Sequence, residues 1–125
     1  QEGTNGVKKN YDAERKGKLI GVPVVVLINE GSASASEILA GAIKVQAKGS
    51  LVGQKSFGKG TIQEVQDFEN GAGLHVTIAK WLLPNGEWIN GKGIVPDYEV
   101  EMTAEDLKAE KDPQLDKALE VIKSK

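Results

Sequence analysis

Three serines alternate with alanines in the segment 31–37, shortly after the apolar run Val22–Ile28. A glycine followed by small residues lets a strand turn sharply into a helix. A serine on such a turn lies at the helix N-terminus, where free N–H groups and the helix dipole stabilise developing negative charge. That environment suits a serine nucleophile and the oxyanion of a tetrahedral intermediate. Ser32, Ser34 and Ser36 are therefore candidate nucleophiles.

The same segment has a purely structural interpretation. Ser34 and Glu37 form the Ser-x-x-Glu pattern of a capping box, in which Ser34 would cap the helix that follows. Serine is common at helix starts for this reason. The segment alone leaves open whether Ser34 is a nucleophile or a cap, and which of the three serines would act.

A lysine between two glycines is the second candidate. Lys59 follows Gly58 and precedes Gly60, in a loop after a short apolar segment. Most lysines are solvated, and this one has that interpretation too. A lysine buried beside apolar groups, however, loses solvation of its charged form, so its pKa falls and it can accept a serine proton. The glycines would let the loop approach another segment closely, and Phe57 could supply an apolar wall.

Phosphate binding is a competing interpretation of this loop. Residues 53–59 fit the first seven positions of the P-loop pattern G-x-x-x-x-G-K. The eighth position should be serine or threonine, which holds magnesium, and here it is Gly60. A P-loop also leads into a helix, whereas Thr-Ile-Gln-Glu-Val after Gly60 favours a strand. Both tests count against a nucleotide-binding NTPase, which is the weakest alternative.

Composition narrows the function classes. The chain has 125 residues, 39% of them hydrophobic and 27% charged, with a formal net charge of -2. That length suits a single domain over 1–125. No basic face indicates nucleic acid, and the longest apolar run, Val22–Ile28, is too short to span a bilayer. Cysteine is absent, and one histidine excludes a two-histidine zinc site.

The histidine and the two tryptophans are interpreted as structural residues. His75 alternates with apolar residues in a predicted strand, which favours a partly buried scaffold residue over a member of a Ser-His-Asp triad. Trp81 and Trp88 bracket a predicted turn and are expected to pack rather than to bind substrate. The charged residues after Thr103 are expected to form solvated helix faces.

Alternating and helical patterns predict a mixed α/β domain with a strand-to-helix turn at its centre. The β-branched apolar run is typical of a strand that is buried on both faces. The best alternating segment places Leu74, Val76 and Ile78 on one face. The expected elements are a weak strand at 7–11, strands at 22–28, 51–52, 61–68 and 74–83, a short strand after 97, a helix after 37 that ends at Gly49, and helices that begin near 103 and at Pro113.

Two blocks together resemble the signatures of the carboxyl-terminal processing proteases, also called tail-specific proteases. They are Gly-Ser-Ala-Ser-Ala-Ser-Glu-Ile from Gly31 and Phe-Gly-Lys-Gly-Thr-Ile-Gln from Phe57. This family consists of serine peptidases with a Ser-Lys dyad. The interval from Ser34 to Lys59 (59 − 34 = 25) matches the family's spacing and selects the middle serine. Gln63 matches a glutamine that follows the lysine by four residues.

The resemblance extends from about Val22 to Glu101. It includes 91–97, Gly-Lys-Gly-Ile-Val-Pro-Asp, which is similar to the segment that closes the family's catalytic core. It implies a crotonase-like (ClpP/crotonase-type) α/β protease core. It also implies a serine endopeptidase that cleaves protein or peptide substrates near a free C-terminus, without a metal or other cofactor.

The resemblance also implies roles for the matched residues. Ser34 would attack the scissile carbonyl, and neutral Lys59 would take its proton and later protonate the leaving amine. Gln63 would orient Lys59, on the same side of its strand because an even number of residues separates the two. The backbone N–H of Ala35 would be one oxyanion donor.

Parts of the family pattern lie outside the match. A PDZ domain and a stretch that supplies a second oxyanion donor should precede Ser34, and Gly3 and Gly6 stand instead in a predicted turn. We therefore expect a C-terminal fragment of the catalytic domain. Val45 occupies a position where many relatives carry aspartate, which argues against a Ser-Lys-Asp arrangement.

Two broader expectations follow from the family. Its members work outside the cytoplasm, so the parent protein is expected to be periplasmic, secreted or membrane-anchored. A noncatalytic interaction module on the same fold is the main alternative function.

Overall fold

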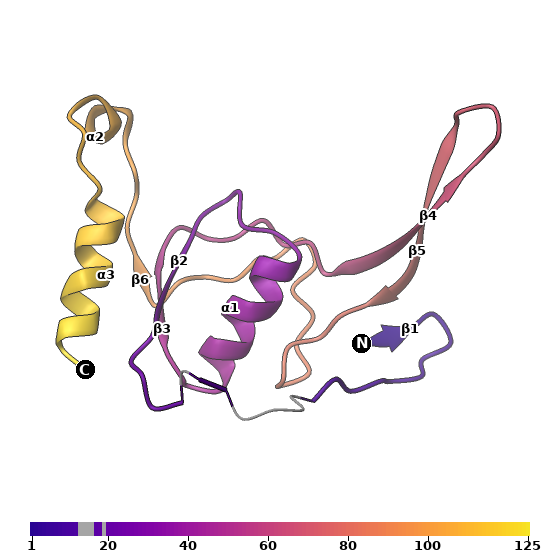
Figure 1. Cartoon of the computed structure of the whole chain (residues 1–125), viewed down its shortest axis with the longest axis horizontal. Helices are drawn as coiled ribbons and strands as arrows, with labels where there is room; N and C mark the ends of the chain where they lie inside the picture. Colours follow the sequence, from indigo (N-terminus) through magenta and orange to yellow (C-terminus); the bar gives the residue numbers. More distant parts are fainter. Residues whose placement is uncertain (13–16, 19) are drawn as a thin grey trace.

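Two small sheets and three helices make up the computed structural model, which describes residues 1–12, 17–18 and 20–125. One sheet is parallel, with the strand order β2-β3-β6, and the other is antiparallel, with the order β1-β5-β4. Helices α2 and α3 lie at one end of the molecule and the β4–β5 hairpin extends from the other (Figure 1). This confirms the mixed α/β class expected from the sequence patterns.

The parallel sheet is built around a strand-helix-strand unit. β2 (Val25–Ile28) is followed by α1 (Ala35–Val45), and β3 (Ser50–Gly53) then pairs parallel to β2. β6 (Tyr98–Glu99) pairs parallel to β3 on its other side. The apolar run therefore supplies a strand that leads directly into the turn at 29–34, which we call the serine turn.

The two faces of β3 pack against different helices. Leu51 and Val52 are both fully buried, and adjacent strand residues point to opposite faces. Leu51 belongs to a core cluster with Ala40 of α1, whereas Val52 packs in a second cluster with residues of α3 (Pro113–Lys123). The sheet is thus covered by α1 on one face and by α3 on the other.

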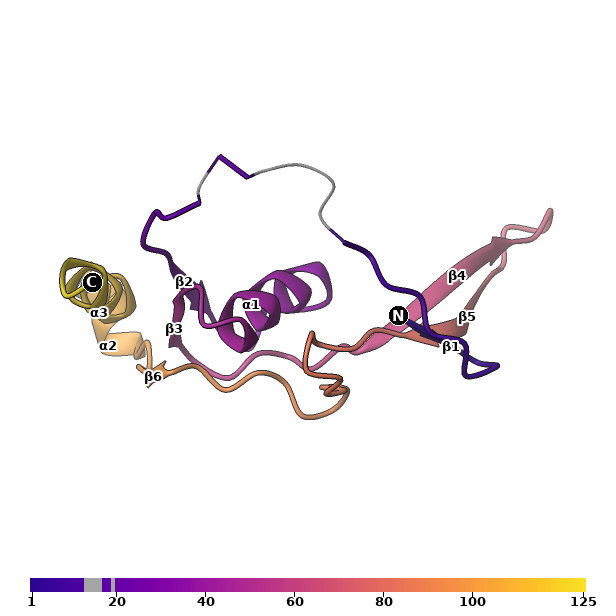
Figure 2. The same cartoon turned by 90° about the horizontal axis from the view of Figure 1, so that it is seen from below.

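The antiparallel sheet forms an arm. β4 (Thr61–Asp67) pairs with β5 (Gly73–Lys80), and the Asn70-Gly71 turn joins them as the sequence predicts. The hairpin projects away from the helices in both views (Figures 1 and 2). Its pairing shifts by one residue between Ile62 and Gln63. Apolar side chains along it are exposed, namely Val65, Phe68, Leu74, Val76 and Ile78.

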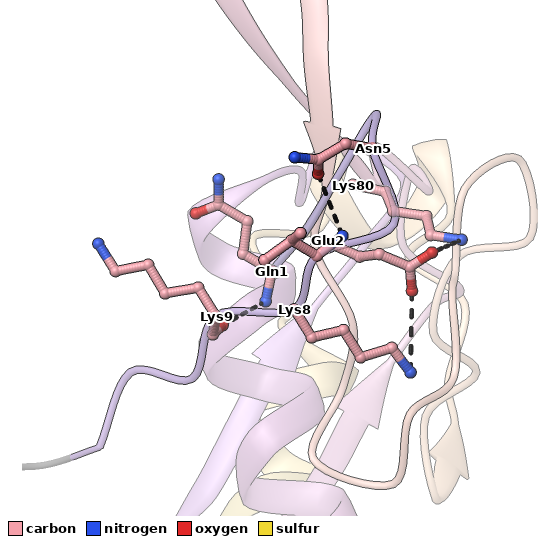
Figure 3. Close-up of polar contacts among 7 residues, drawn as sticks. Gln1, Glu2, Asn5, Lys8, Lys9 and Lys80 are labelled. Atoms are coloured by element: carbon pink, nitrogen blue, oxygen red, sulfur yellow. Dashed lines mark hydrogen bonds and ion pairs between the residues drawn. The ribbon is translucent and has the colours of Figure 1, made fainter.

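A short N-terminal strand holds the chain start against this arm. β1 (Glu2–Gly3) pairs antiparallel with the end of β5. The Glu2 carboxylate lies 3.0 Å from the Lys80 ammonium and 3.8 Å from that of Lys8 (Figure 3). The hydrogen bond from Lys80 is the main cause that lowers the pKa of Glu2. All three side chains are at least partly exposed to solvent, so these ion pairs contribute little to stability.

The C-terminal helices begin with side-chain caps. Thr103 caps α2 (Ala104–Lys108) by accepting from the Asp106 amide, and the Thr103 hydroxyl and amide lower the pKa of Asp106. Asp112 caps α3 by accepting from the Leu115 amide. Both starts lie where the sequence predicts them.

Several expected elements differ from those observed. Residues 7–11, all described, contain only an isolated bridge from Lys8 to Glu2 and no strand. The helix after 37 already ends at Val45, and Ala47 has a left-handed φ of 52° that a helix does not continue through. β2 is shorter than predicted, and Leu27 is half exposed.

No helix among the described residues combines the length and the apolar character that crossing a bilayer requires.

Removal of apolar volume from the sheet-facing side of α3 should destabilise the domain. Val121 is 4% exposed, so Val121→Ala should lower the free energy of unfolding by about 1–3 kcal/mol. Leu119 on the same helix is half exposed, and Leu119→Ala should cost only about 0.5 kcal/mol. Urea unfolding followed by circular dichroism measures both. Equal losses would contradict the packing of α3 on β3.

Candidate active site

Ser34 occupies a strained turn between β2 and α1. Its φ of 55° and ψ of −113° are unusual for a residue with a side chain and store roughly 1–3 kcal/mol of strain. A serine on a sharp, strained strand-to-helix turn is the arrangement by which hydrolases present a nucleophile. A residue that only caps a helix does not need this strained backbone conformation.

The neighbouring serines have different environments. Ser32 lies within the turn, where its hydroxyl accepts from the Asn29 amide at 3.1 Å and donates to the Asn29 side chain at 3.4 Å. Ser36 is exposed on the first turn of α1. Ala35 is the first residue of α1, so its N–H belongs to the amides that a helix leaves without an internal acceptor.

Glu37 is the polar centre of the site. Its side chain is completely buried. Oε2 accepts from the Ser34 amide at 3.0 Å and from the Lys59 amide at 2.9 Å. Oε1 accepts from the Ser56 hydroxyl at 2.5 Å and from the Gly58 amide at 2.6 Å. One carboxylate therefore joins the serine turn to the loop at 54–60, which we call the lysine loop.

The capping-box interpretation of Ser34 and Glu37 is correct in part. The bond from the Ser34 amide to Glu37 is the carboxylate half of that motif. The Ser34 side chain and the Glu37 amide stand in the matching arrangement, without reaching the geometry of a side-chain capping hydrogen bond. The sequence pattern did not indicate that Glu37 also binds the lysine loop, because those donors come from residues about twenty positions later.

The lysine loop is held by two tryptophans. Trp81 Nε1 donates to the Lys59 carbonyl at 2.9 Å, and Trp88 Nε1 donates to the Gly60 carbonyl at 2.8 Å. Trp81 is buried in the main core cluster and Trp88 is half exposed. The expectation that both tryptophans pack holds for Trp81, but sequence analysis missed that both fix the backbone around Lys59.

The segment after Trp88 lies directly on the same loop. The Gly91 amide donates to the Gly58 carbonyl at 2.9 Å, and the Ser56 amide donates to the Ile94 carbonyl at 3.0 Å. A Cβ atom on Gly58 would lie 2.7 Å from the Gly93 nitrogen. Backbone meets backbone here, so glycine is required on both sides.

The structure brings the backbones of Ser34 and Lys59 close together, but it does not join their side chains by a hydrogen bond. Because Ser34 and Lys59 donate to the same carboxylate oxygen, their amide nitrogens are no farther apart than the sum of those two bonds. Among the hydrogen bonds of the described residues, none joins the Ser34 hydroxyl to the Lys59 ammonium. Such bonds are often long in enzymes without bound substrate.

Gln63 and His75 lie on the hairpin arm. Gln63 is exposed in β4, which begins only at Thr61, so the strand alternation used to align it with Lys59 does not extend back to the lysine. His75 is exposed in β5, so its expected partial burial is wrong. Neither core cluster includes His75, and a histidine triad gains no support from its position.

The N-terminal glycines are occupied within their own turn. The Gly3 amide donates to the Val7 carbonyl at 3.0 Å, and the Gly6 amide donates to the Gly3 carbonyl at 2.9 Å. Neither amide is available for an oxyanion. A depression of about 370 Å³ lies between this turn and the arm, and Thr61 and Trp88 form part of its lining.

Comparison with known proteins identifies the family. Residues 1–100 match the model described as peptidase family S41. The chain belongs to this family. Across 98 residues, or 78% of the chain, it is 43% identical to the carboxy-terminal processing protease CtpA of Bacillus subtilis and 44% identical to a probable CtpA-like serine protease of Staphylococcus saprophyticus.

Solved structures of peptidases are similar to the S41 chain. The photosystem II D1 C-terminal processing protease is 47% identical and superposes with a TM-score of 0.59, over 65% of this chain and 21% of its own. The tricorn protease, at 24% identity, shares the fold over 94% of this chain and 12% of its own, with a TM-score of 0.72. The S41 chain spans about a fifth of the length of the curated relatives that it matches, 21% for CtpA of Bacillus subtilis.

Two glycines of the covering segment should respond differently to alanine. Gly91 and Gly93 both have positive φ, 71° and 68°, so each change adds about 1 kcal/mol of backbone strain. A Cβ on Gly93 would also lie 2.2 Å from the Ser56 carbonyl oxygen, whereas nothing lies within 4 Å of one on Gly91. Gly93→Ala should therefore destabilise by about 1–3 kcal/mol more than Gly91→Ala in urea unfolding. Equal effects would contradict the described contact.

Proposed function

We propose that this chain carries the nucleophile and the general base of a serine endopeptidase with a Ser34–Lys59 dyad and a crotonase-like core. The observation that carries the proposal is the shared carboxylate: Glu37 accepts from the backbone at both residues. Membership of peptidase family S41 and the likeness to named serine proteases support the same reaction class.

The reaction proceeds through an acyl-enzyme. The Ser34 hydroxyl oxygen attacks the carbonyl carbon of the scissile peptide while neutral Lys59 takes the hydroxyl proton. The Ala35 amide donates to the oxyanion of the tetrahedral intermediate. The C–N bond then breaks, Lys59 returns the proton to the leaving amine, and Ser34 is left as an ester. Lys59 then takes a proton from water, and the resulting hydroxide attacks the ester carbon. The ester C–O bond breaks, Lys59 returns the proton to the Ser34 oxygen, and the carboxylic acid product leaves.

The strained backbone at Ser34 and the fixed backbone at Lys59 support their roles as nucleophile and general base. The turn that begins α1 directs developing negative charge toward the positive end of the helix dipole. The tryptophans hold the carbonyls of Lys59 and Gly60, so the lysine side chain extends from a backbone that is held in place. Gln63, from the start of the arm, acts as a positioning residue for Lys59.

The substrates are protein or peptide chains that are cut near a free C-terminus. Relatives named for carboxy-terminal processing support this substrate class. The parent protein acts outside the cytoplasm, as the family resemblance implies. A relative from Tetradesmus obliquus is named as chloroplastic, which concerns that protein alone.

The alternatives have less support. A P-loop requires a helix after its lysine, and β4 follows Lys59 instead. A noncatalytic module on the same fold would not need a serine with φ of 55° at the mouth of a helix. Nucleotide binding by the wild-type chain would favour the first alternative over the peptidase.

Replacement of the nucleophile tests the serine assignment. Ser34→Ala should lower proteolysis by on the order of 10³-fold or more, because no other group forms the ester. Ser36→Ala is the matched control, since Ser36 is an exposed serine of the same helix, and it should keep most activity. Rates on a protein substrate with a free C-terminal tail, together with labelling by a fluorophosphonate probe, measure both. A dead Ser36→Ala with an active Ser34→Ala would overturn the assignment.

Replacement of the base tests the lysine. Arginine keeps the positive charge but does not lose its proton, so Lys59→Arg should be as inactive as Lys59→Ala. His75→Ala should retain most activity, as its side chain is exposed on the arm. An active Lys59→Arg enzyme would exclude the mechanism, and an inactive, folded His75→Ala would favour a triad.

A further inference from the structure

The lysine loop contains a second buried polar side chain that the mechanism does not use. Ser56 is 5% exposed, and together with Glu37 it makes up the buried polar residues of the described chain. Its hydroxyl donates to Glu37 Oε1 at 2.5 Å and accepts from the Ile94 amide at 2.7 Å. Ser56 is therefore bonded on both sides within the protein and is closed to substrate.

The position of Glu37 depends on these donors. A buried carboxylate needs full compensation, and Glu37 forms no ion pair within the described residues. Its four hydrogen bonds come from Ser34, Ser56, Gly58 and Lys59. Ser56 supplies the only side-chain donor of the four, and the others are backbone amides.

The two carboxylate oxygens have separate tasks. Oε2 accepts from the amides of Ser34 and Lys59, and Oε1 accepts from Ser56 and Gly58. Bonds on Oε1 fix the rotation of the carboxylate and hence the direction in which Oε2 faces. Through Ile94, the same hydroxyl also ties this carboxylate to the 91–97 segment.

We propose that Ser56 is a positioning residue of the peptidase reaction. It acts through the buried Glu37 carboxylate and sets the distance between the serine turn and the lysine loop. The proposal rests on the Ser34–Lys59 mechanism. Ser56 touches neither substrate nor reacting atoms. Its loss lets the carboxylate rotate, so that Ser34 and Lys59 no longer share one fixed acceptor.

This role predicts a loss in the chemical step rather than in substrate binding. Misplacement of reacting groups by about 1 Å can cost on the order of 10²-fold in rate. Ser56→Ala should therefore lower kcat by about tenfold to hundredfold and leave KM within about twofold. Ser56→Cys keeps the shape but donates weakly, so its kcat should fall between those of alanine and wild type.

The experiment compares the rate and the extent of fluorophosphonate labelling in the protein that carries this chain. In Ser56→Ala the labelling rate should fall with kcat, while the final extent, which counts folded sites, stays that of the wild type. Ser124→Ala is the matched control, because it also removes a hydrogen-bonded hydroxyl, at the end of α3, and should change neither quantity. A purely structural role would lower the extent and leave the rate of the remaining sites unchanged, which would overturn the proposal.

A double-mutant comparison tests whether the effect passes through Glu37. In a Glu37→Gln background, Ser56→Ala should lower kcat further by less than about threefold, since the acceptor is already altered. Full additivity of the two losses would overturn the route through the carboxylate. If Ser56→Ala does not fold, Ser56→Cys is used for the rate and extent measurements, and a wild-type rate in that variant counts against the proposal.

Failure of this proposal is distinct from failure of the mechanism. If wild-type labelling does not depend on Ser34, the Ser34–Lys59 mechanism fails and Ser56 has no reaction to position. If labelling depends on Ser34 but folded Ser56 variants react as fast as the wild type, the mechanism stands and only the role of Ser56 is excluded.

Discussion

The carboxylate of Glu37 is buried without an ion-pair partner among the described residues, so its charge depends on hydrogen-bond donors that reach it from elsewhere. An uncompensated carboxylate in that position would cost several kcal/mol. Two of its donors, Ser34 and Lys59, belong to the serine turn and to the lysine loop. If either segment moved away, the buried carboxylate would lose hydrogen-bond donors. The two segments therefore hold their positions together.

Close approach of backbones is the second constraint on the site. The lysine loop lies between the serine turn and the 91–97 segment. Its Phe57 amide donates a hydrogen bond to the Ser32 carbonyl of the serine turn. Cβ atoms at Gly58 or Gly93 would collide with main-chain atoms of the opposite segment. Lys44 of α1 forms an ion pair with Asp97 at 2.9 Å, which anchors the far end of that segment to the helix that follows the serine turn. The 91–97 segment thus holds the lysine loop in place against α1.

Local patterns predicted the elements well where they were also covered by a core. The strand-helix-strand unit, the Asn70-Gly71 hairpin and the helix that starts at Pro113 all appear as expected. Burial was predicted poorly where the pattern was regular but no cover exists. Leu74, Val76 and Ile78 share one face of an alternating strand yet are exposed, and His75 on the same strand is exposed as well. Periodicity indicates which residues share a face, and only a packing partner decides whether that face is buried.

The sequence by itself determined the serine turn, the Gly-Lys-Gly loop and their resemblance to one peptidase family, because these are short blocks whose residue types carry the chemistry. Tertiary structure alone decided that Glu37, which pattern analysis treats as part of a helix cap, accepts from both blocks at once. It also decided that Trp81 and Trp88 hold the lysine backbone. Such contacts join residues some twenty to thirty positions apart, and a local pattern contains no information on which distant donor will meet a buried acceptor.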